Sequence, residues 1–223
     1  MNAFVLAGGE SSRMGRDKAL LDLAGRPLIA HALDKLRALG CTPRICGSRP
    51  DLAAFAPVIP DRIPRCGPLG GLEAALSLSD SDLNLFLPVD LPLLPLEFLR
   101  WLQTRAAASG AAATLPRYAG RPQPLCAIYS RRLLPGLRAA LAAGNYKIMS
   151  AVSAAAATLH ERSASSEMDA FDTESIAAAL IPHLWPADPP LHAWFRNINF
   201  PGDYDSLRAA FGNAASGQNP AIQ

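Results

Sequence analysis

The sequence predicts an α/β fold with a mostly parallel sheet, and three observations lead to this prediction. Short apolar runs of the kind that form buried strands alternate along the chain with segments of helical spacing. Turns that contain Gly or Pro separate these segments. Half of the 223 residues are hydrophobic and 18% are charged, which gives a globular chain enough apolar side chains for a sizeable core.

The first half of the chain contains the clearest strand and helix patterns. Residues 2–7 form an apolar run that leads directly into Gly8 and Gly9, as expected of a buried strand and the turn after it. Pro27 begins a segment with apolar residues at helical spacing, and Gly40 ends it. Further strands are predicted at 44–47, 57–60, 83–90 and 111–115, and further helices at 68–78 and 95–109.

The second half of the chain carries weaker patterns. Four prolines within 180–193 indicate an irregular surface excursion or a packing piece, and the Ala/Ser-rich segment 150–166 is interpreted as a helix with a loose tail. We expect a single domain over residues 1–212 and a mobile polar tail at 213–223. Strands are predicted at 124–129 and 195–199, and helices at 131–143 and 203–211.

Composition excludes several classes of protein. A net charge of +2 without a block of Lys or Arg argues against nucleic-acid binding. No segment approaches the roughly 18 apolar residues of a membrane span, and the N-terminus lacks the form of a signal peptide. The four cysteines form no C-x-x-C pair, so we expect free thiols rather than disulfides or a zinc site. These features together predict a cytoplasmic protein.

The loop after the first strand has the residues that bind polyphosphate. Its glycines, Gly8 and Gly9, let backbone N–H groups approach phosphate oxygens, and Arg13 and Lys18 supply positive charge. The spacing matches neither a Walker A loop nor the G-x-G-x-x-G dinucleotide fingerprint. The alternative is a tight turn in which glycine serves only the backbone conformation.

A second candidate site lies where the strand predicted at 83–90 ends. Asp90 directly follows its apolar residues, where an unpaired charge is costly. Mg²⁺ would offset that cost, because it takes one or two protein oxygens while phosphates and water complete its shell. Capping of the helix near Pro95 is the alternative. Asn197 and Asn199 end another predicted strand, and ligands bind at the carboxyl ends of parallel strands.

Several motifs in this order resemble the molybdenum cofactor guanylyltransferases, a branch of the nucleotidyltransferases. Residues 6–18 fit the signature L-A-G-G-x-S-x-R-M-G-x-D-K at every defined position, and residues 67–71 fit G-P-L-x-G. Residues 90–92 fit D-x-P, residues 197–199 fit N-x-N, and residues 121–125 resemble an H/Q-P-L element on the acceptor side. The resemblance implies a Rossmann-like, three-layer αβα nucleotidyltransferase fold with a mostly parallel mixed sheet.

The resemblance also implies roles for individual residues. Catalytic roles fall to Arg13, Lys18 and Asp90, and metal binding to Asp90 and Asn199. A solvated loop position is the alternative for Arg13, and a strand-end cap is the alternative for Asn199. Nucleotide binding falls to Leu6, Ala7, Gly8, Gly9, Lys18, Asp61, Gly67 and Asp90.

The implied reaction transfers GMP from GTP to a molybdopterin-type cofactor with Mg²⁺ as the metal, and pyrophosphate leaves. Residues 1–115 would then bind the nucleotide and residues 116–212 the acceptor. A molybdoenzyme chaperone is a partner compatible with this role, although the sequence itself identifies none. The alternatives are a molybdopterin cytidylyltransferase, a sugar-phosphate nucleotidyltransferase, and a nucleotide-binding module without turnover. Cytidylyl relatives resemble L-A-A-G where this chain has Ala7-Gly8-Gly9, which favours GTP.

The chain departs from the family pattern in two places. Cys46-Gly47-Ser48 stands where the family often has an asparagine after the second strand, so a contact to guanine or ribose is in doubt. The segment between Lys147 and Asn197 is longer than in the family and rich in Ala and Pro, so the identity of the acceptor is the weakest inference.

Overall fold

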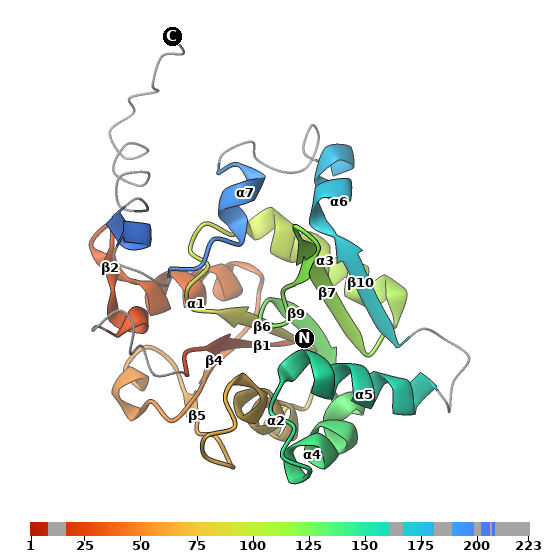
Figure 1. The fold of residues 1–223 in the computed structure, drawn as a ribbon. Helices are drawn as coiled ribbons and strands as arrows, with labels where there is room; N and C mark the ends of the chain where they lie inside the picture. The colour runs from red at the N-terminus through yellow and green to blue at the C-terminus, as the bar shows by residue number, and fades with distance from the viewer. Residues whose placement is uncertain (9–16, 161–166, 181–188, 199–201, 206, 208–223) are drawn as a thin grey trace.

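The computed structural model describes residues 1–8, 17–160, 167–180, 189–198, 202–205 and 207. An eight-stranded sheet forms its centre, with strand order β10-β7-β9-β6-β1-β4-β5 and with β8 paired to β7 (Figure 1). A separate hairpin consists of β2 (Asp22–Leu23) and β3 (Arg26–Pro27). The strands of the large sheet are β1 (Asn2–Leu6), β4 (Pro43–Cys46), β5 (Val58–Ile59), β6 (Leu83–Pro88), β7 (Ala113–Tyr118), β8 (Arg121–Pro122), β9 (Ala127–Ser130) and β10 (Met168–Asp172).

The sheet is mostly parallel, as predicted. β5, β4, β1 and β6 are neighbours that run in the same direction. β9 is antiparallel to both β6 and β7, so β7 runs in the same direction as β6. The carboxyl ends of β1, β4, β5, β6 and β7 therefore lie along one edge of the sheet, where α/β proteins bind their ligands.

Helices cover both faces of the sheet and complete the predicted three layers (Figure 1). One face carries α1 (Leu28–Ala38), α3 (Leu96–Ser109), α6 (Thr173–Leu180) and α7 (Leu191–Trp194), and the other carries α2 (Pro68–Leu78), α4 (Leu134–Ala142) and α5 (Ile148–His160). None of the described helices is both long and apolar enough to cross a membrane.

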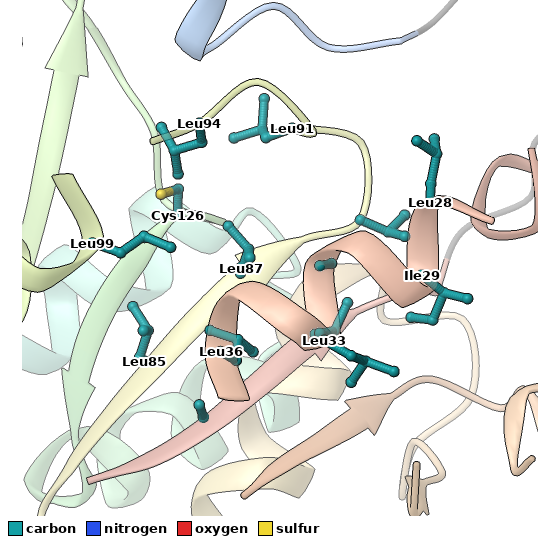
Figure 2. Packing of buried hydrophobic residues seen from close by; sticks show 14 of the residues in the cluster. Leu28, Ile29, Leu33, Leu36, Leu85, Leu87, Leu91, Leu94, Leu99 and Cys126 are labelled. Atoms are coloured by element: carbon teal, nitrogen blue, oxygen red, sulfur yellow. The ribbon is translucent and has the colours of Figure 1, made fainter. Parts of the chain in front are cut away.

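The alternation of side chains along each strand explains why both faces are apolar. In β1, Ala3 and Val5 belong to the cluster beneath α1 and α3, whereas Phe4 belongs to the cluster beneath α2 and α4. A strand that is buried on both faces is mostly apolar, and β1 and β6 each contain a single polar residue, Asn2 and Asn84. Figure 2 shows the first cluster, in which leucines of α1 lie against Leu85 and Leu87 of β6.

The helix boundaries predicted around Pro27 and Gly40 are confirmed. Pro27 is the N-cap residue of α1, with a φ of −68°. Gly40 follows the helix with a φ of 76°, a left-handed conformation that glycine adopts without strain. The predicted helix at 68–78 is also confirmed as α2, and all four cysteines are free.

The strand predicted at 195–199 is wrong over the residues that the structure describes. Residues 195–198 form no strand. Phe195 and Ile198 are buried instead in the core cluster beneath α1 and α3, because α7 brings the fully buried Trp194 to the same place. Phe195 and Ile198 therefore pack into this core cluster and do not form an edge strand of the sheet. The edge position next to β7 belongs to β10, which the sequence did not predict.

Candidate active site

The candidate site lies at the carboxyl ends of four parallel strands. β1 leads to Ala7 and Gly8, β4 to Gly47, β5 to Asp61, and β6 to Asp90. These strands are neighbours in the order β5-β4-β1-β6, so the four loops lie side by side. The fold thus brings together residues that the sequence separates by more than 80 positions.

Backbone hydrogen bonds extend the pairing of these strands into the loops. The Ala7 N–H donates to the Cys46 carbonyl at 3.1 Å, and the Val89 N–H donates to the Leu6 carbonyl at 3.2 Å. Gly47 has a φ of +130°, and a Cβ there would lie 3.0 Å from the Cα and N of Gly8. Only glycine permits this close approach of two backbones. The residues that lead into the glycine loop are therefore fixed by backbone contacts with β4, Gly47 and Val89.

Of the residues predicted in this loop, Leu6 is half-buried, Ala7 is buried and Gly8 is exposed. Gly9 and Arg13 lie outside the described residues.

Lys18 and Asp90 meet across the site. The Lys18 Nζ lies 3.4 Å from Asp90 Oδ2, and the two side chains are 21% and 19% exposed. Burial raises the pKa of the Asp90 carboxyl, and the Lys18 ammonium partly offsets this effect. A partly buried carboxylate that is paired with one cation can also bind a second cation, and Lys18 can then bind an anion.

The capping alternative for Asp90 is wrong. The N-cap residue of α3 is Pro95, five residues later in the sequence. Asp90 directs its carboxylate toward Lys18 instead, at the carboxyl end of β6.

Asp61 has a buried carboxylate oxygen without a hydrogen-bond partner among the described residues. This atom is Oδ1, and burial raises the pKa of the Asp61 carboxyl. A Cβ on Gly71 would lie 3.5 Å from Oδ1 and 3.6 Å from Leu6 Cδ2, so Asp61 lies where the first turn of α2 approaches the end of β1. A buried acceptor normally has a donor, so this oxygen is suited to a ligand N–H or O–H group.

Gly67 begins the helix that approaches Asp61, namely α2. It is the N-cap of α2 and has a φ of 58° and a ψ of −153°, a conformation that favours glycine. Pro68 then starts the helix, and Gly70 and Gly71 allow its first turn to pass close to Cys66, Asp61 and Leu6. The predicted G-P-L-x-G element thus sets the distance between α2 and the end of β1.

Comparison with known proteins agrees with this arrangement. The MobA-like NTP transferase domain matches residues 3–159. The chain belongs to this family. A molybdenum cofactor guanylyltransferase of Vibrio cholerae is 40% identical over 151 residues, which cover 65% of this chain and 73% of that protein. A probable molybdenum cofactor guanylyltransferase of Methanothermobacter thermautotrophicus is 32% identical over 209 residues, which cover 89% of this chain and 94% of that protein.

The fold agrees with a solved structure of similar description. The molybdopterin-guanine dinucleotide biosynthesis protein A of Archaeoglobus fulgidus superposes with a TM-score of 0.72 at 23% identity, over 97% of this chain and all of that one. The predicted nucleotidyltransferase fold and the resemblance on which it was based are both confirmed. As a MobA-like NTP transferase, the chain is a nucleotidyltransferase enzyme.

The MobA-like family suggests a divalent metal, and the described residues fit a magnesium-like ion better than zinc. Among the described residues, no group of three or more His, Cys, Asp and Glu side chains lies close enough to bind a metal. Zinc normally needs three or four such ligands, whereas Mg²⁺ takes one or two carboxylates and completes its shell with phosphate oxygens and water. Asp90 supplies one such carboxylate. Asn199 lies outside the described residues, and Asn197 is exposed.

Arg49 is a site residue that sequence reasoning missed. It follows β4 by three positions, and its guanidinium contacts Asp17, Asp51 and the Ala7 carbonyl. Its side chain is only 19% exposed. The hydrogen bonds with Asp51 and Asp17 raise the pKa of Arg49 above its usual range. The sequence carried one signal, namely a lone arginine just after a strand that ends at the site.

Lys35 is the second missed residue, and it holds the loop after β6. Its Nζ donates to the carbonyls of Pro92 and Leu94, the latter at 2.7 Å. Burial lowers the pKa of Lys35 to about 8, and the neighbouring Cys126 thiol acts weakly in the opposite direction. Leu91 and Leu94 of this loop are buried in the core (Figure 2). Helical spacing alone puts Lys35 on the buried face of α1, because it lies seven residues after Leu28.

The predicted acceptor element lies at the same edge of the sheet. Residues 121–125 comprise β8 and the turn into β9, and they follow the carboxyl end of β7. The Gln123 N–H donates to the Pro116 carbonyl at 2.9 Å, which closes this turn against β7. β9 separates β7 from β6, so this element is two strands away from the end of β6 that carries Asp90.

Proposed function

We propose that this chain is a molybdenum cofactor guanylyltransferase, which transfers GMP from GTP to a molybdopterin-type cofactor. The terminal phosphate of the cofactor would attack the α-phosphorus of GTP, forming a new P–O–P bond while pyrophosphate leaves. A phosphate dianion is already a competent nucleophile, so the enzyme mainly has to position the two substrates and neutralise charge. Residues 1–115 would bind GTP and residues 116–212 the acceptor.

The contact between Lys18 and Asp90 carries this proposal. It joins the residue that follows the loop after β1, where we place the triphosphate, to the end of β6, where we place the metal. Lys18 would bind the phosphates of GTP together with the backbone N–H groups of the loop and, in the same proposal, Arg13. Binding of an anion by Lys18 leaves the Asp90 carboxylate for Mg²⁺, and Asn199 is proposed as a further ligand. Bound there, Mg²⁺ would neutralise charge on the α-phosphate and on the departing pyrophosphate.

The remaining predicted residues would bind the rest of the nucleotide. Leu6, Ala7, Gly8 and Gly9 would line it, and Gly67 would keep α2 at the right distance. Asp61 would accept a hydrogen bond from the nucleoside, since its Oδ1 is buried and unpartnered among the described residues. The four free thiols also fit the proposed cytoplasmic location.

The test is an assay of pyrophosphate release with purified protein, molybdopterin and Mg²⁺, in which GTP and CTP are compared. We expect release with GTP and at least roughly tenfold less with CTP, a difference that corresponds to about 1.4 kcal/mol of discrimination. Release that requires CTP would identify a cytidylyltransferase instead. Binding of nucleotide without release from any triphosphate would identify a binding module. Omission of Mg²⁺ should abolish release, and Mn²⁺ should restore part of it.

A further inference from the structure

Arg49 lies beside the candidate site and uses all of its hydrogen-bond donors on protein atoms. Its Nε donates to Asp51 Oδ1 at 2.9 Å, and its Nη1 donates to Asp17 Oδ1 at 3.2 Å and to the Ala7 carbonyl at 3.4 Å. Its Nη2 donates to Asp51 Oδ2 at 2.6 Å and to Asp17 Oδ2. A guanidinium has five N–H donors, so none is left for a phosphate unless one of these contacts breaks.

Two of the partners of Arg49, Ala7 and Asp17, lie on the two flanks of the glycine loop. Ala7 precedes the loop, and Asp17 is the residue directly before Lys18. Asp17 is also the N-cap of the short 3-10 turn Lys18–Leu20, in which its Oδ1 accepts a hydrogen bond from the Ala19 N–H at 2.9 Å. One side chain therefore joins the entrance of the loop to the turn that begins with Lys18.

The charge of Asp17 gives this contact a second consequence. Asp17 places a carboxylate one residue before the lysine that would bind phosphates, and this carboxylate would repel them. Arg49 partly neutralises this charge, because it also pairs with Asp51, and the Arg49 and Asp17 side chains are only 19% and 34% exposed, so solvent screens the charge incompletely. Loss of Arg49 would release the turn and also leave a negative charge next to the phosphate site.

We propose that Arg49 is a positioning residue, which fixes both flanks of the glycine loop and directs Lys18 toward Asp90 through Asp17. The inference deepens the proposed function and rests on it for the identity of the nucleotide. It does not make Arg49 a catalytic residue, because the five donors of its guanidinium are used on protein atoms. Its effect should therefore appear in polyphosphate binding and in the order of the Lys18 turn.

The chain itself offers a matched control, namely Asp51. Asp51 binds the same guanidinium as Asp17, but its side chain is 49% exposed and it is not part of either flank of the glycine loop. Asp51→Asn weakens one side of the Arg49 cluster and leaves the side that faces the loop. Arg49→Met removes both sides and keeps an unbranched apolar chain in the same place.

The first experiment measures the affinity of the full chain for GTP and for GMP in the presence of Mg²⁺. We expect Arg49→Met to weaken GTP binding at least roughly tenfold and GMP binding less than about threefold, because the β- and γ-phosphates meet the uncompensated Asp17 charge. Asp51→Asn should change GTP affinity less than about twofold. Adding Asp17→Asn to Arg49→Met should recover part of the lost affinity, since it removes the unpaired charge.

The second experiment needs no nucleotide and measures hydrogen exchange at the Ala19 amide. That amide donates to Asp17, so its exchange should become at least about tenfold faster in Arg49→Met and remain unchanged in Asp51→Asn. Unchanged Ala19 exchange in Arg49→Met would overturn the inference, and so would equal losses of GTP and GMP affinity. If the unmodified chain binds no GTP, the proposed function fails, while the exchange experiment still decides whether Arg49 orders the turn.

Discussion

The two halves of the sheet differ in the contacts that hold the segments near their carboxyl ends. Around β1, β4, β5 and β6, the loops are tied by charged side chains, as in the contacts of Lys18 with Asp90, Arg49 with Asp17 and Lys35 with two carbonyls. Around β7 and β10, aromatic rings pack against one another and against residues 194–195, next to an ion pair of Arg105 with Asp169. Polar contacts have preferred directions and fix the positions of side chains, whereas ring packing mainly contributes buried area.

The ring contacts of the second half come from elements far apart in the chain. Phe98 and Trp194 lie 5.6 Å apart between ring centroids, Tyr118 and Phe195 also lie 5.6 Å apart, and Trp101 and Phe171 lie 4.9 Å apart. The first two pairs join α3 and β7 to residues 194–195, and the third joins α3 to β10. Substitutions in the two halves should therefore separate stability from activity.

The largest expected effect is the loss of stability in Trp194→Ala. Trp194 is fully buried, and its Nε1–H donates to the Pro189 carbonyl at 2.7 Å. Truncation of a buried Trp or Phe to Ala costs about 3–5 kcal/mol. Urea unfolding should show this loss, whereas GTP affinity measured well below the unfolding transition should remain within about twofold. A large loss of GTP affinity in a folded Trp194→Ala protein would show that packing around Trp194 also affects nucleotide binding.

Asp90→Asn should have the opposite pattern. Removal of one electrostatic contact to a transition state typically costs about 10²–10³-fold in turnover, and we expect a loss of that size in pyrophosphate release. Stability should change by less than about 1 kcal/mol, because the substitution keeps the shape and removes a charge whose burial is unfavourable. Metal affinity, followed with Mn²⁺ by electron paramagnetic resonance, should fall in parallel. Unfolding of the variant, with no specific loss of metal binding, would assign Asp90 a structural role.

How much the sequence predicted depends on whether a contact is local. The strand at residues 2–6, the helix at 68–78 and the position of Asp90 at the end of a strand each follow from a contiguous pattern, and the structure confirms them. The roles of Gly9, Arg13 and Asn199 stay predictions. β10 was missed because its sequence Met-Asp-Ala-Phe-Asp is short and contains two aspartates, and its place depends on pairing with β7 from more than 50 residues away.

The C-terminal segment and the two missed cations illustrate the same limit. Residues 195–198 read as a short strand from the sequence, but they follow Trp194, which packs on Phe98, and form no strand. Arg49 and Lys35 gain their roles only from loops brought next to them by the sheet, at sequence separations of 32 for Asp17 and 59 for Leu94. A pattern within one segment does not contain such partners.

The smallest expected effect concerns Lys35 and depends on pH. Burial lowers its pKa to about 8, whereas the unfolded chain keeps the ordinary value of 10.5. Below pH 8 both states are protonated and the folded state carries the full cost of the buried charge. Between pH 8 and 10.5 the unfolded state binds more protons, so the free energy of unfolding should rise with pH by roughly 3 kcal/mol relative to Lys35→Met.

Urea unfolding of both proteins at pH 7.0 and at pH 10.5 tests this, because every other titrating group is common to the two chains. Lys35→Met leaves the carbonyls of Pro92 and Leu94 without this donor, but that loss is present at both pH values and cancels from the comparison. Parallel pH profiles would mean that the Lys35 ammonium is not destabilised by burial. If the free energy of unfolding of the unmodified chain rises with pH relative to that of Lys35→Met, the buried Lys35 ammonium lowers the stability of the folded chain at pH 7.0. The contact of Lys35 with the loop after β6 is then kept at a cost in stability.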